Sequence, residues 1–317
     1  MQLNNVEIVD TFAEGFSSYF ARVLITAKDA YWAKQAALCA TGFATSTIHC
    51  PCEAGIDKEV PATETPDGRP GIIVMFVAGK EKMPEVLLDR VGQCILTCPS
   101  TAVFDAFPQD LVDDKTGEAP TGKNLAFFGD GFQVKDEESF PFVTHKIPVM
   151  GGEFVVQSTF KFGKGVAGGN LILQAESLDA CADVAKAAVE AASTVNGVIM
   201  PFPGGVCASG SKVGSKYEFL NASTNDAMCP TLKGKVGKGK DEDGNPIEIP
   251  VNSQVFDGVN AVLEIIFDGM SGDAVKEAMK AAVQAAVQVP GLVAITAGNY
   301  EGKLGKGKHD FYLKDLV

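Results

Sequence analysis

The pattern of hydrophobic and polar positions repeats one order of elements in both halves of the chain. Each half is predicted to run strand, helix, strand, long loop rich in Pro and Gly, strand, helix, strand. The strands are expected at 22–27, after Gly42, at 72–77 and at 94–98 in the first half, and at 170–175, after Gly197, at 261–267 and at 293–297 in the second. The long loops are expected at 51–71 and from Pro201 onward.

Four amphipathic helices are predicted between these strands. Two of them are expected to start at Asp29 and Ser177, whose side-chain oxygens can accept from free N–H groups of a first helical turn. The expected apolar faces are Trp32, Ala36 and Cys39; Val86, Leu87 and Val91; Val184, Ala188 and Ala191; and Val275, Met279, Ala282 and Ala286. A split β-α-β order of this kind is typical of ferredoxin-like domains. The sequence therefore predicts an α+β chain of two duplicated ferredoxin-like lobes, residues 1–150 and 151–317, with mainly antiparallel sheets.

Three segments do not fit the repeat. Residues 124–148, with the apolar runs 125–128 and 143–149, are expected to add strands and the passage to the second half. Residues 110–123 are polar and predicted to be peripheral. Residues 233–245 are rich in Gly and end in the turn signal Asp-Gly-Asn-Pro, which predicts a solvated hairpin.

One carboxylate, Glu264, stands in the middle of the apolar strand at 261–267. Val262 and Ile266 share its strand face, so the ionised form is expected to be poorly solvated and the pKa of Glu264 raised. A carboxyl group of that kind is suited to proton transfer near neutrality. The alternative is an ordinary polar residue on the wet face of a half-covered sheet. In the alignment of the two halves, the counterpart of Glu264 is Val74.

Length, charge and cysteine content narrow the class of protein. The chain has 317 residues, enough for about two domains, and a formal net charge of -13. Nucleic acid and anionic membranes are poor partners for such a surface. Acidity fits a salt-rich cytoplasm or simply solubility. The first ten residues lack a basic segment followed by an apolar one, and no apolar run approaches a membrane span. The protein is therefore expected to be cytoplasmic with eight reduced cysteines.

Common nucleotide and metal motifs fail on context. Residues 163–168 have the Gly spacing of a dinucleotide fingerprint, but they precede a strand and do not open a helix. His49, Cys50 and Cys52 could hold a metal ion, yet no second Cys or His pair has zinc-site spacing. Ordinary thiols in a turn are the favoured interpretation, and no metal site is predicted.

The Pro- and Gly-rich loops contain the candidate binding residues. Arg69 lies in the turn-rich stretch 64–71, directly before a strand. In the second half the candidates are small, hydroxylated or cationic: Pro203, Gly204, Gly205, Ser209, Ser211, Lys212, Lys216 and Asn225. Backbone donors and ammonium groups so close together suit a long ligand with carboxylates or a phosphodiester. An ordinary surface loop is the alternative.

Several stretches together resemble one family. They are Thr41-Gly-Phe-Ala-Thr45, Cys50-Pro-x-Glu-Ala-Gly-Ile56, 64–71, Leu88-x-Arg-x-Gly-Gln-Cys94, 201–205, Ser211-Lys-x-Gly214 and Ala297-Gly-Asn-Tyr-x-Gly-Lys-Leu-Gly305. In these motifs the chain is similar to the formylmethanofuran:tetrahydromethanopterin formyltransferases over nearly its whole length. Two departures are Cys52, in place of an alanine, and a longer segment at 233–245.

This resemblance implies formyl transfer from methanofuran to nitrogen 5 of tetrahydromethanopterin, with the two carriers as cosubstrates and no permanently bound cofactor. It implies a two-lobed subunit, a homotetramer built as a dimer of dimers, and an active cleft near subunit contacts. The matching catalytic carboxylate is Glu264, although Leu263 departs from the family's Tyr-Glu-Ile pattern. Glu53, in the second motif, joins the candidate substrate-binding residues.

Two alternatives from other classes stay open at this stage. One is a non-catalytic subunit that keeps the fold, and the other is a duplicated ferredoxin-like protein that binds small ligands. Attack on a formamide creates an oxyanion and requires one proton to leave the attacking nitrogen and one to reach the departing amine. A carboxyl group with a raised pKa meets both demands, so Glu264 favours the enzyme.

Overall fold

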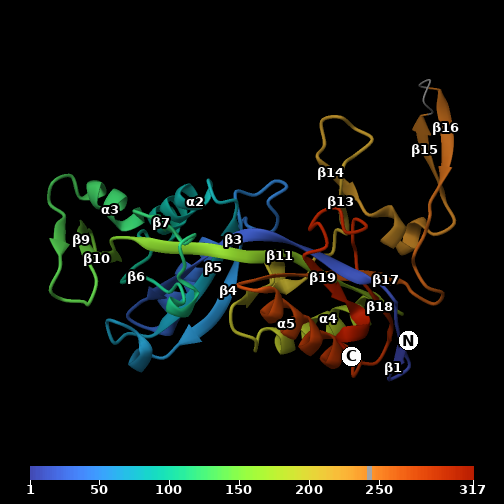
Figure 1. Ribbon diagram of the computed structural model, residues 1–317, viewed down its shortest axis with the longest axis horizontal. Coiled ribbons are helices and arrows are strands. Elements are labelled where there is room, and N and C mark those ends of the chain that lie inside the picture. The colour runs from blue at the N-terminus through green and yellow to red at the C-terminus, as the bar shows by residue number, and fades with distance from the viewer. Residues whose placement is uncertain (241–244) are drawn as a thin grey trace.

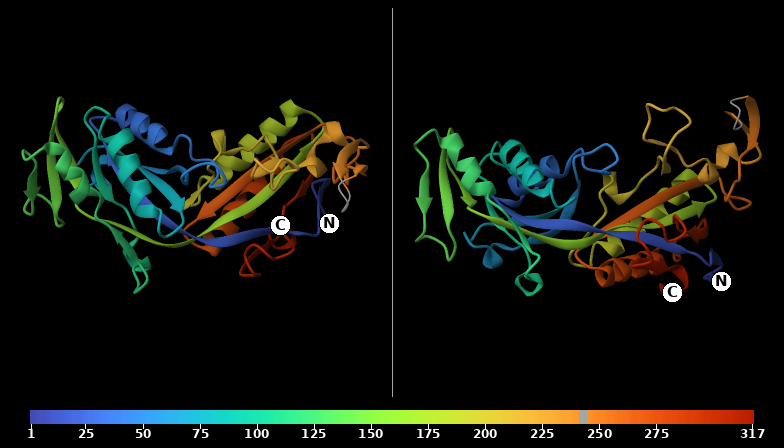
Figure 2. Two further views of the ribbon diagram at one scale, coloured as in Figure 1. Left: turned by 90° about the horizontal axis from the view of Figure 1, so that it is seen from above. Right: turned by 45° about the horizontal axis from the view of Figure 1, so that its top comes forward.

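Two long strands run through the whole molecule and join its two lobes (Figure 1). The computed structural model describes residues 1–240 and 245–317. β3 (Phe12–Thr26) and β11 (Phe160–Ala175) pair antiparallel at the centre, where Ser17 lies opposite Val166 and Ser18 opposite Gly165. Beyond this crossing each strand continues into one lobe, so the sheet is continuous and the molecule is elongated (Figure 2).

The first lobe contains the sheet order β4-β5-β3-β6-β10-β9-β8. Its strands besides β3 are β4 (Glu53–Val60), β5 (Gly71–Ala78), β6 (Ala102–Asp105), β7 (Gly117–Ala119), β8 (Val134–Asp136), β9 (Thr144–Val149) and β10 (Gly152–Gln157). Its helices are α1 (Ala30–Thr41), α2 (Met83–Arg90), which continues as a π-helix (Val91–Ile95), and α3 (Thr121–Leu125). α1 and α2 cover one face and pack on buried residues such as Val23, Val74 and Phe76.

The second lobe contains the order β12-β17-β11-β18-β2-β1. Its strands besides β11 are β1 (Gln2–Leu3), β2 (Val6–Ile8), β12 (Val198–Ile199), β17 (Ala261–Gly269), β18 (Leu292–Thr296) and β19 (His309–Tyr312), which pairs with β3. α4 (Leu178–Ala192) and α5 (Gly272–Ala286) cover one face and pack on Leu171, Ile265 and Phe267. Two hairpins, β13 (Ser211–Val213) with β14 (Ala222–Thr224) and β15 (Val236–Lys240) with β16 (Pro246–Pro250), project from this lobe (Figure 1).

The lobes exchange strands. β10, which leads into β11, lies in the first lobe, where it pairs parallel to β6. β2, which leads into β3, lies in the second lobe, where it pairs parallel to β18. The packed cores therefore cross the division predicted between residues 150 and 151, since Ile8 belongs to the core of the second lobe and Phe154 to that of the first. That division stays a prediction.

Much of the predicted element order is confirmed. The fold is α+β with mainly antiparallel pairing. Asp29 and Ser177 cap α1 and α4, because their side chains accept from the N–H groups of Trp32 and Ala180 at 3.1 and 3.2 Å. The hairpin expected in 233–245 exists as β15 and β16, and the first half of its predicted turn at 243–246 lies outside the described residues. Within the described part of the chain, no helix is both long and apolar enough to cross a bilayer.

Four local predictions are wrong. Residues 94–98 are not a strand but the end of the α2 helical run, and the strand is β6. The predicted loop 51–71 contains β4. Residues 125–128 are helical. On α1, Cys39 is exposed, and the buried face is built from alanines.

The predicted counterpart of Glu264 is also wrong. Val74 faces α1 and α2, whereas Glu264 points to the sheet face away from the helices. The caps Asp29 and Ser177 stand at the same place after β3 and β11 and are 148 residues apart, so Leu24 corresponds to Ile172. Ile172 lies opposite Glu264 and Leu24 lies opposite Ile73, so pairing aligns Glu264 with Ile73.

Candidate active site

Glu264 lies at the centre of β17, on the face that the helices leave free. Its neighbours Leu263 and Ile265 point into the core under α4 and α5, as strand alternation requires. The segment after β12 pairs with the edge of β17: the N–H of Cys207 donates to the carbonyl of Glu264 at 2.7 Å, and the N–H of Glu264 donates to the carbonyl of Cys207 at 2.9 Å. This edge contact holds Cys207 beside Glu264 and begins the covering layer.

The covering layer over this sheet face includes the segment before β17 that contains Gln254 and Phe256. One buried polar side chain of β11, Gln174, holds this segment against the sheet. Gln174, 0% exposed, donates from Nε2 to the carbonyl of Gln254 at 3.1 Å and accepts from the N–H of Phe256 at 3.0 Å. The wet sheet face considered from sequence is therefore largely covered, and Glu264 is half-buried.

The carboxyl group of Glu264 is held in one orientation. Asn170 donates from Nδ2 to Oε1 of Glu264 at 2.6 Å, and its own Oδ1 accepts from the N–H of Gly298 at 3.0 Å. Burial raises the pKa of Glu264 above the ordinary value of a glutamate, and the hydrogen bond from Asn170 opposes part of that rise. The raised pKa predicted from the sequence is thus confirmed in direction.

A cavity of about 140 Å³ lies beside this carboxyl group. Among the predicted binding residues, Ser209 and Asn225 line it together with Glu264. Ser209 is within 3.2 Å of the Cys207 thiol and 3.0 Å of the Ser211 hydroxyl, so a short row of polar groups runs from the cavity toward β13. Ile172, Met228 and Val262 supply apolar wall, and this mixture suits a small polar group held against a largely apolar surface.

The two predicted lysines lie outside the cavity. Lys212 on β13 pairs with Asp226, which follows Asn225 in the chain. Lys216 donates to the carbonyl of Lys238 on β15 and so links the two projecting hairpins. Both side chains belong to the two projecting hairpins and not to the lining of the cavity. A ligand in the cavity could contact them only through a part that lies away from Glu264.

The Pro-Gly-Gly turn has a packing role that the sequence did not reveal. Pro203 to Gly205 form a single 3-10 turn between β12 and Cys207. Gly205 has φ +80°, and a Cβ there would lie 2.8 Å from the side chain of Val189 on α4. The turn therefore packs closely on α4 and directs the chain toward Cys207.

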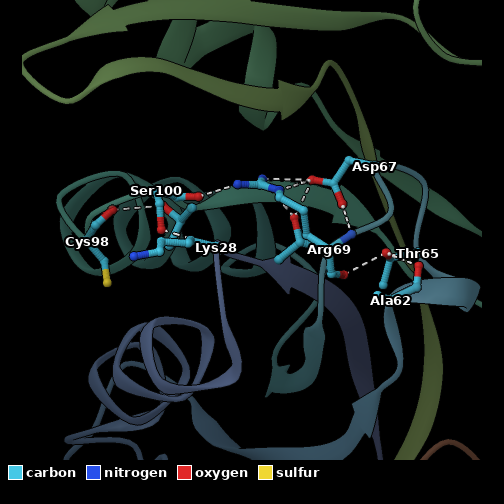
Figure 3. A network of polar contacts seen from close by, with 9 residues as sticks. Lys28, Ala62, Thr65, Asp67, Arg69, Cys98 and Ser100 are labelled. Carbon is cyan, nitrogen blue, oxygen red and sulfur yellow. Dashed lines mark hydrogen bonds and ion pairs between the residues drawn. The ribbon is translucent and has the colours of Figure 1, made fainter.

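Arg69 belongs to a separate network in the first lobe (Figure 3). Its Nε donates to Asp67 at 2.8 Å, and Nη1 donates to the carbonyl of Ser100 at 2.5 Å, while Thr65 donates to its carbonyl at 2.7 Å. These contacts fasten the loop before β5, and the structure does not bring Arg69 to the Glu264 cavity.

Glu53 is buried at the start of β4, where its Oε1 accepts from the N–H and the hydroxyl of Thr47 at 3.0 and 3.4 Å. It too lies apart from the residues that line the cavity. Sequence reasoning missed Asn170, which fixes the catalytic candidate. The available signal was a polar residue at the same place in both long strands, because aligning the caps Asp29 and Ser177 places Arg22 at the position of Asn170.

A half-buried carboxyl group with a raised pKa beside a small cavity is an arrangement that suits an enzyme with acid-base chemistry. Residues 1–149 match the family model for formylmethanofuran-tetrahydromethanopterin formyltransferase, and residues 152–316 match the model for the proximal lobe of that enzyme. The chain therefore belongs to the formylmethanofuran:tetrahydromethanopterin formyltransferase family.

Individual relatives agree over the full length. The formyltransferase of Methanocaldococcus jannaschii is 50% identical, with 100% of this chain and 99% of the relative covered. The solved formyltransferase of Methanosarcina barkeri is 43% identical with a TM-score of 0.88, and both chains are covered completely. A chain of the Methylorubrum extorquens formyltransferase/hydrolase complex, solved with methylofuran, is 41% identical with a TM-score of 0.88. That match covers 100% of this chain and 98% of the Methylorubrum chain. These comparisons do not favour a non-catalytic protein.

Proposed function

We propose that the cavity beside Glu264 is where this chain transfers a formyl group between formylmethanofuran and nitrogen 5 of tetrahydromethanopterin. One observation carries the proposal: Asn170 fixes a half-buried carboxyl group with a raised pKa at the rim of a small cavity whose lining is partly polar and partly apolar. Membership of the formyltransferase family supports the reaction and the two substrates.

The chemistry needs one proton to move between two nitrogens. The pterin nitrogen attacks the formyl carbon, a C–N bond forms, and the carbonyl oxygen becomes an oxyanion. Ionised Glu264 accepts the proton that leaves the attacking nitrogen and passes it to the methanofuran nitrogen as the old C–N bond breaks. The carbonyl re-forms and Glu264 is ionised again, so the cycle is balanced in either direction without a redox partner.

The raised pKa suits both halves of this exchange. As a base, Glu264 is stronger than an ordinary carboxylate, and as an acid it still protonates an amine readily. Asn170 limits rotation of the carboxyl group, so the same oxygen faces the cavity in both steps. The covering layer limits water around the formyl group and so suppresses hydrolysis to formate.

The remaining predicted residues are proposed as binding residues in three groups. Ser209 and Asn225 contact the reacting end, since they line the cavity. Ser211, Lys212 and Lys216 hold an anionic tail along the projecting hairpins, and the turn 203–205 shapes the entrance. Arg69, in the first lobe, is proposed to bind a part of the substrates far from the formyl group. Glu53, whose carboxyl group is buried, is proposed to support binding indirectly by holding the loop at Thr47.

Several wider features belong to the same proposal. We propose that the lobes are duplicated ferredoxin-like units, a view supported by the shared order of strand and capped helix: Asp29 and Ser177, 148 residues apart, cap the helices that follow β3 and β11. We further propose a homotetramer built as a dimer of dimers, located in the cytoplasm, that needs no permanently bound cofactor.

A formyl-transfer assay with the two purified carriers tests the function. The wild-type chain should move the formyl group, and Glu264→Gln should lower turnover by roughly 10²- to 10⁴-fold, because glutamine cannot carry the proton. Circular dichroism and sedimentation should match the wild type. Glu277→Gln, an exposed change on α5, serves as the control and should be fully active. Normal turnover in folded Glu264→Gln would refute the role of Glu264, and no transfer by the wild type would refute the function.

A further inference from the structure

A second carboxyl group on β17 is buried more deeply than Glu264. Asp268 is 0% exposed and lies on the same strand face, four residues further along. Its Oδ1 accepts from the N–H of Gly168 at 3.0 Å, at the bulge where β11 shifts register against β17. Its Oδ2 is buried and has no hydrogen-bond donor among the described residues. An orphaned carboxylate oxygen in such a place is strongly unfavourable.

The group that faces Asp268 comes from the other lobe. It is the carboxyl of Glu53, the first residue of β4. β4 reaches the second lobe at this point, because Asp57 on the same strand accepts from the N–H of Gly197 at 2.8 Å, and Gly55 packs against Ile199 of β12. Two acceptors therefore meet at the junction of the lobes, and no hydrogen bond can join them unless one carries a proton.

The surrounding charges do not relieve this contact. On β3, Arg22 is committed to Asp57, to which its Nε donates at 2.7 Å. Arg90, at the end of α2, donates to the carbonyls of Ala40, Gly42 and Phe43. Around Asp268 itself, β11 presents the N–H of Gly168 and β12 presents Ile199, neither of which is charged. The loop before β4 adds only the N–H and hydroxyl of Thr47, already used by Glu53.

We propose that Asp268 is a neutral acid in the folded protein and donates its proton to Glu53, so that one shared proton joins the two lobes. The orphaned oxygen then becomes a donor, and both carboxyl groups are satisfied. Asp268 is a positioning residue: it ties β17, the strand that carries Glu264, to β4. The inference concerns the lobe junction and does not depend on the identity of the transferred group.

A proton held by Asp268 makes the stability of the folded protein depend on pH in a definite direction. Burial, and then the charge of Glu53, raise the pKa of Asp268 well above its ordinary value. In the unfolded chain the pKa of this aspartate is about 3.9, so at higher pH the folded chain binds one proton more than the unfolded chain. Stability therefore falls as the pH rises from that value toward the pKa of Asp268 in the folded protein. A variant that cannot titrate at this position loses that slope.

Asp268→Asn is the decisive variant, because its amide can donate to Glu53 while its oxygen still accepts from Gly168. We expect it to fold, to keep turnover within about twofold, and to show a flatter dependence of unfolding on pH. Asp268→Leu removes the donor that Asp268 offers to Glu53, leaves Glu53 only its contacts with Thr47, and should lower turnover by about tenfold or more. Rescue by Asn but not by Leu separates a hydrogen-bond donor from mere filling of space.

Infrared spectroscopy detects the protonated carboxyl group of Asp268 directly. In a Glu264→Gln background, well above the pKa of about 6 to which burial raises Asp105, a carboxylic-acid C=O band should be present and should vanish in Asp268→Asn. Asp57→Asn, a matched buried change, should leave the band, because Asp57 is paired with Arg22 as a carboxylate. Absence of the band, its persistence in Asp268→Asn, or failure of that variant to fold would each overturn the shared proton. None of these readouts requires formyl transfer.

Discussion

At the scale of single residues, the site is a chain of three groups: Glu264, Asn170 and the N–H of Gly298. The corresponding place in the first lobe has Arg22 in the position of Asn170, and Arg22 turns to Asp57. Glu264 could be predicted because a charge in an apolar strand is conspicuous. Asn170 was missed, since an asparagine at a predicted strand end looks like an ordinary boundary residue until the two halves are aligned on their helix caps.

Asn170→Ala should shift the pH dependence of turnover. The lost hydrogen bond stabilises ionised Glu264, so its pKa should rise further and the acid limb of the kcat profile should move up by roughly one pH unit. Turnover at a fixed pH below the limb should fall accordingly. Asn260→Ala removes a hydrogen bond to the carbonyl of Glu176 and serves as the control. An acid limb that stays in place would show that Asn170 does not tune Glu264.

At the scale of elements, the caps Asp29 and Ser177 predicted the starts of α1 and α4, and helical periodicity predicted α5 with its buried face. The strand at 94–98 was wrong because Cys-Ile-Leu-Thr-Cys has strand composition, yet the helical run of α2 continues through Gly92 to Ile95. The counterpart of Glu264 was misaligned because every residue of β5 is buried. A strand without polar alternation does not reveal its register from sequence, and an error of one residue exchanges its two faces.

The hairpin formed by β13 and β14 offers a test of binding apart from chemistry. Lys212→Met removes an exposed cation paired with Asp226. If Lys212 holds an anionic tail, KM should rise by roughly fivefold with little change in kcat, as expected for equal binding of ground and transition states. Lys233→Met, which removes a similar exposed pair with Asp257, is the control. A selective loss of kcat would instead assign Lys212 to the chemistry, and no change would make this an ordinary surface loop.

At the scale of the whole molecule, the sequence predicted two lobes of the same element order. It did not predict the exchange of β2 and β10, because parallel pairing between strands so far apart in sequence leaves no local pattern. The net charge of -13, in contrast, was readable at once and bears on assembly. Like-charged subunits repel one another at low ionic strength, and salt screens that repulsion.

Oligomer size should therefore depend on salt. Sedimentation across a potassium phosphate series is expected to show smaller species at low concentration and the tetramer at high concentration. A potassium chloride series at matched ionic strength separates screening from the exclusion effect of phosphate. An unchanged oligomer from low to high salt in both series would contradict an electrostatic control of assembly.

The pairing of β2 with β18 has a consequence for biosynthesis. Glu7 and Ile8 lie beside Ala294 and Ile295. β2, one of the first strands to be synthesised, therefore cannot complete its pairing until β18, one of the last, has left the ribosome. β10 meets β6 much earlier, so the first lobe can close while the second is still being made. The second lobe, which carries Glu264, can close only when synthesis is almost complete. A nascent chain truncated before β18 should thus contain a protease-resistant first lobe and no formyltransferase activity.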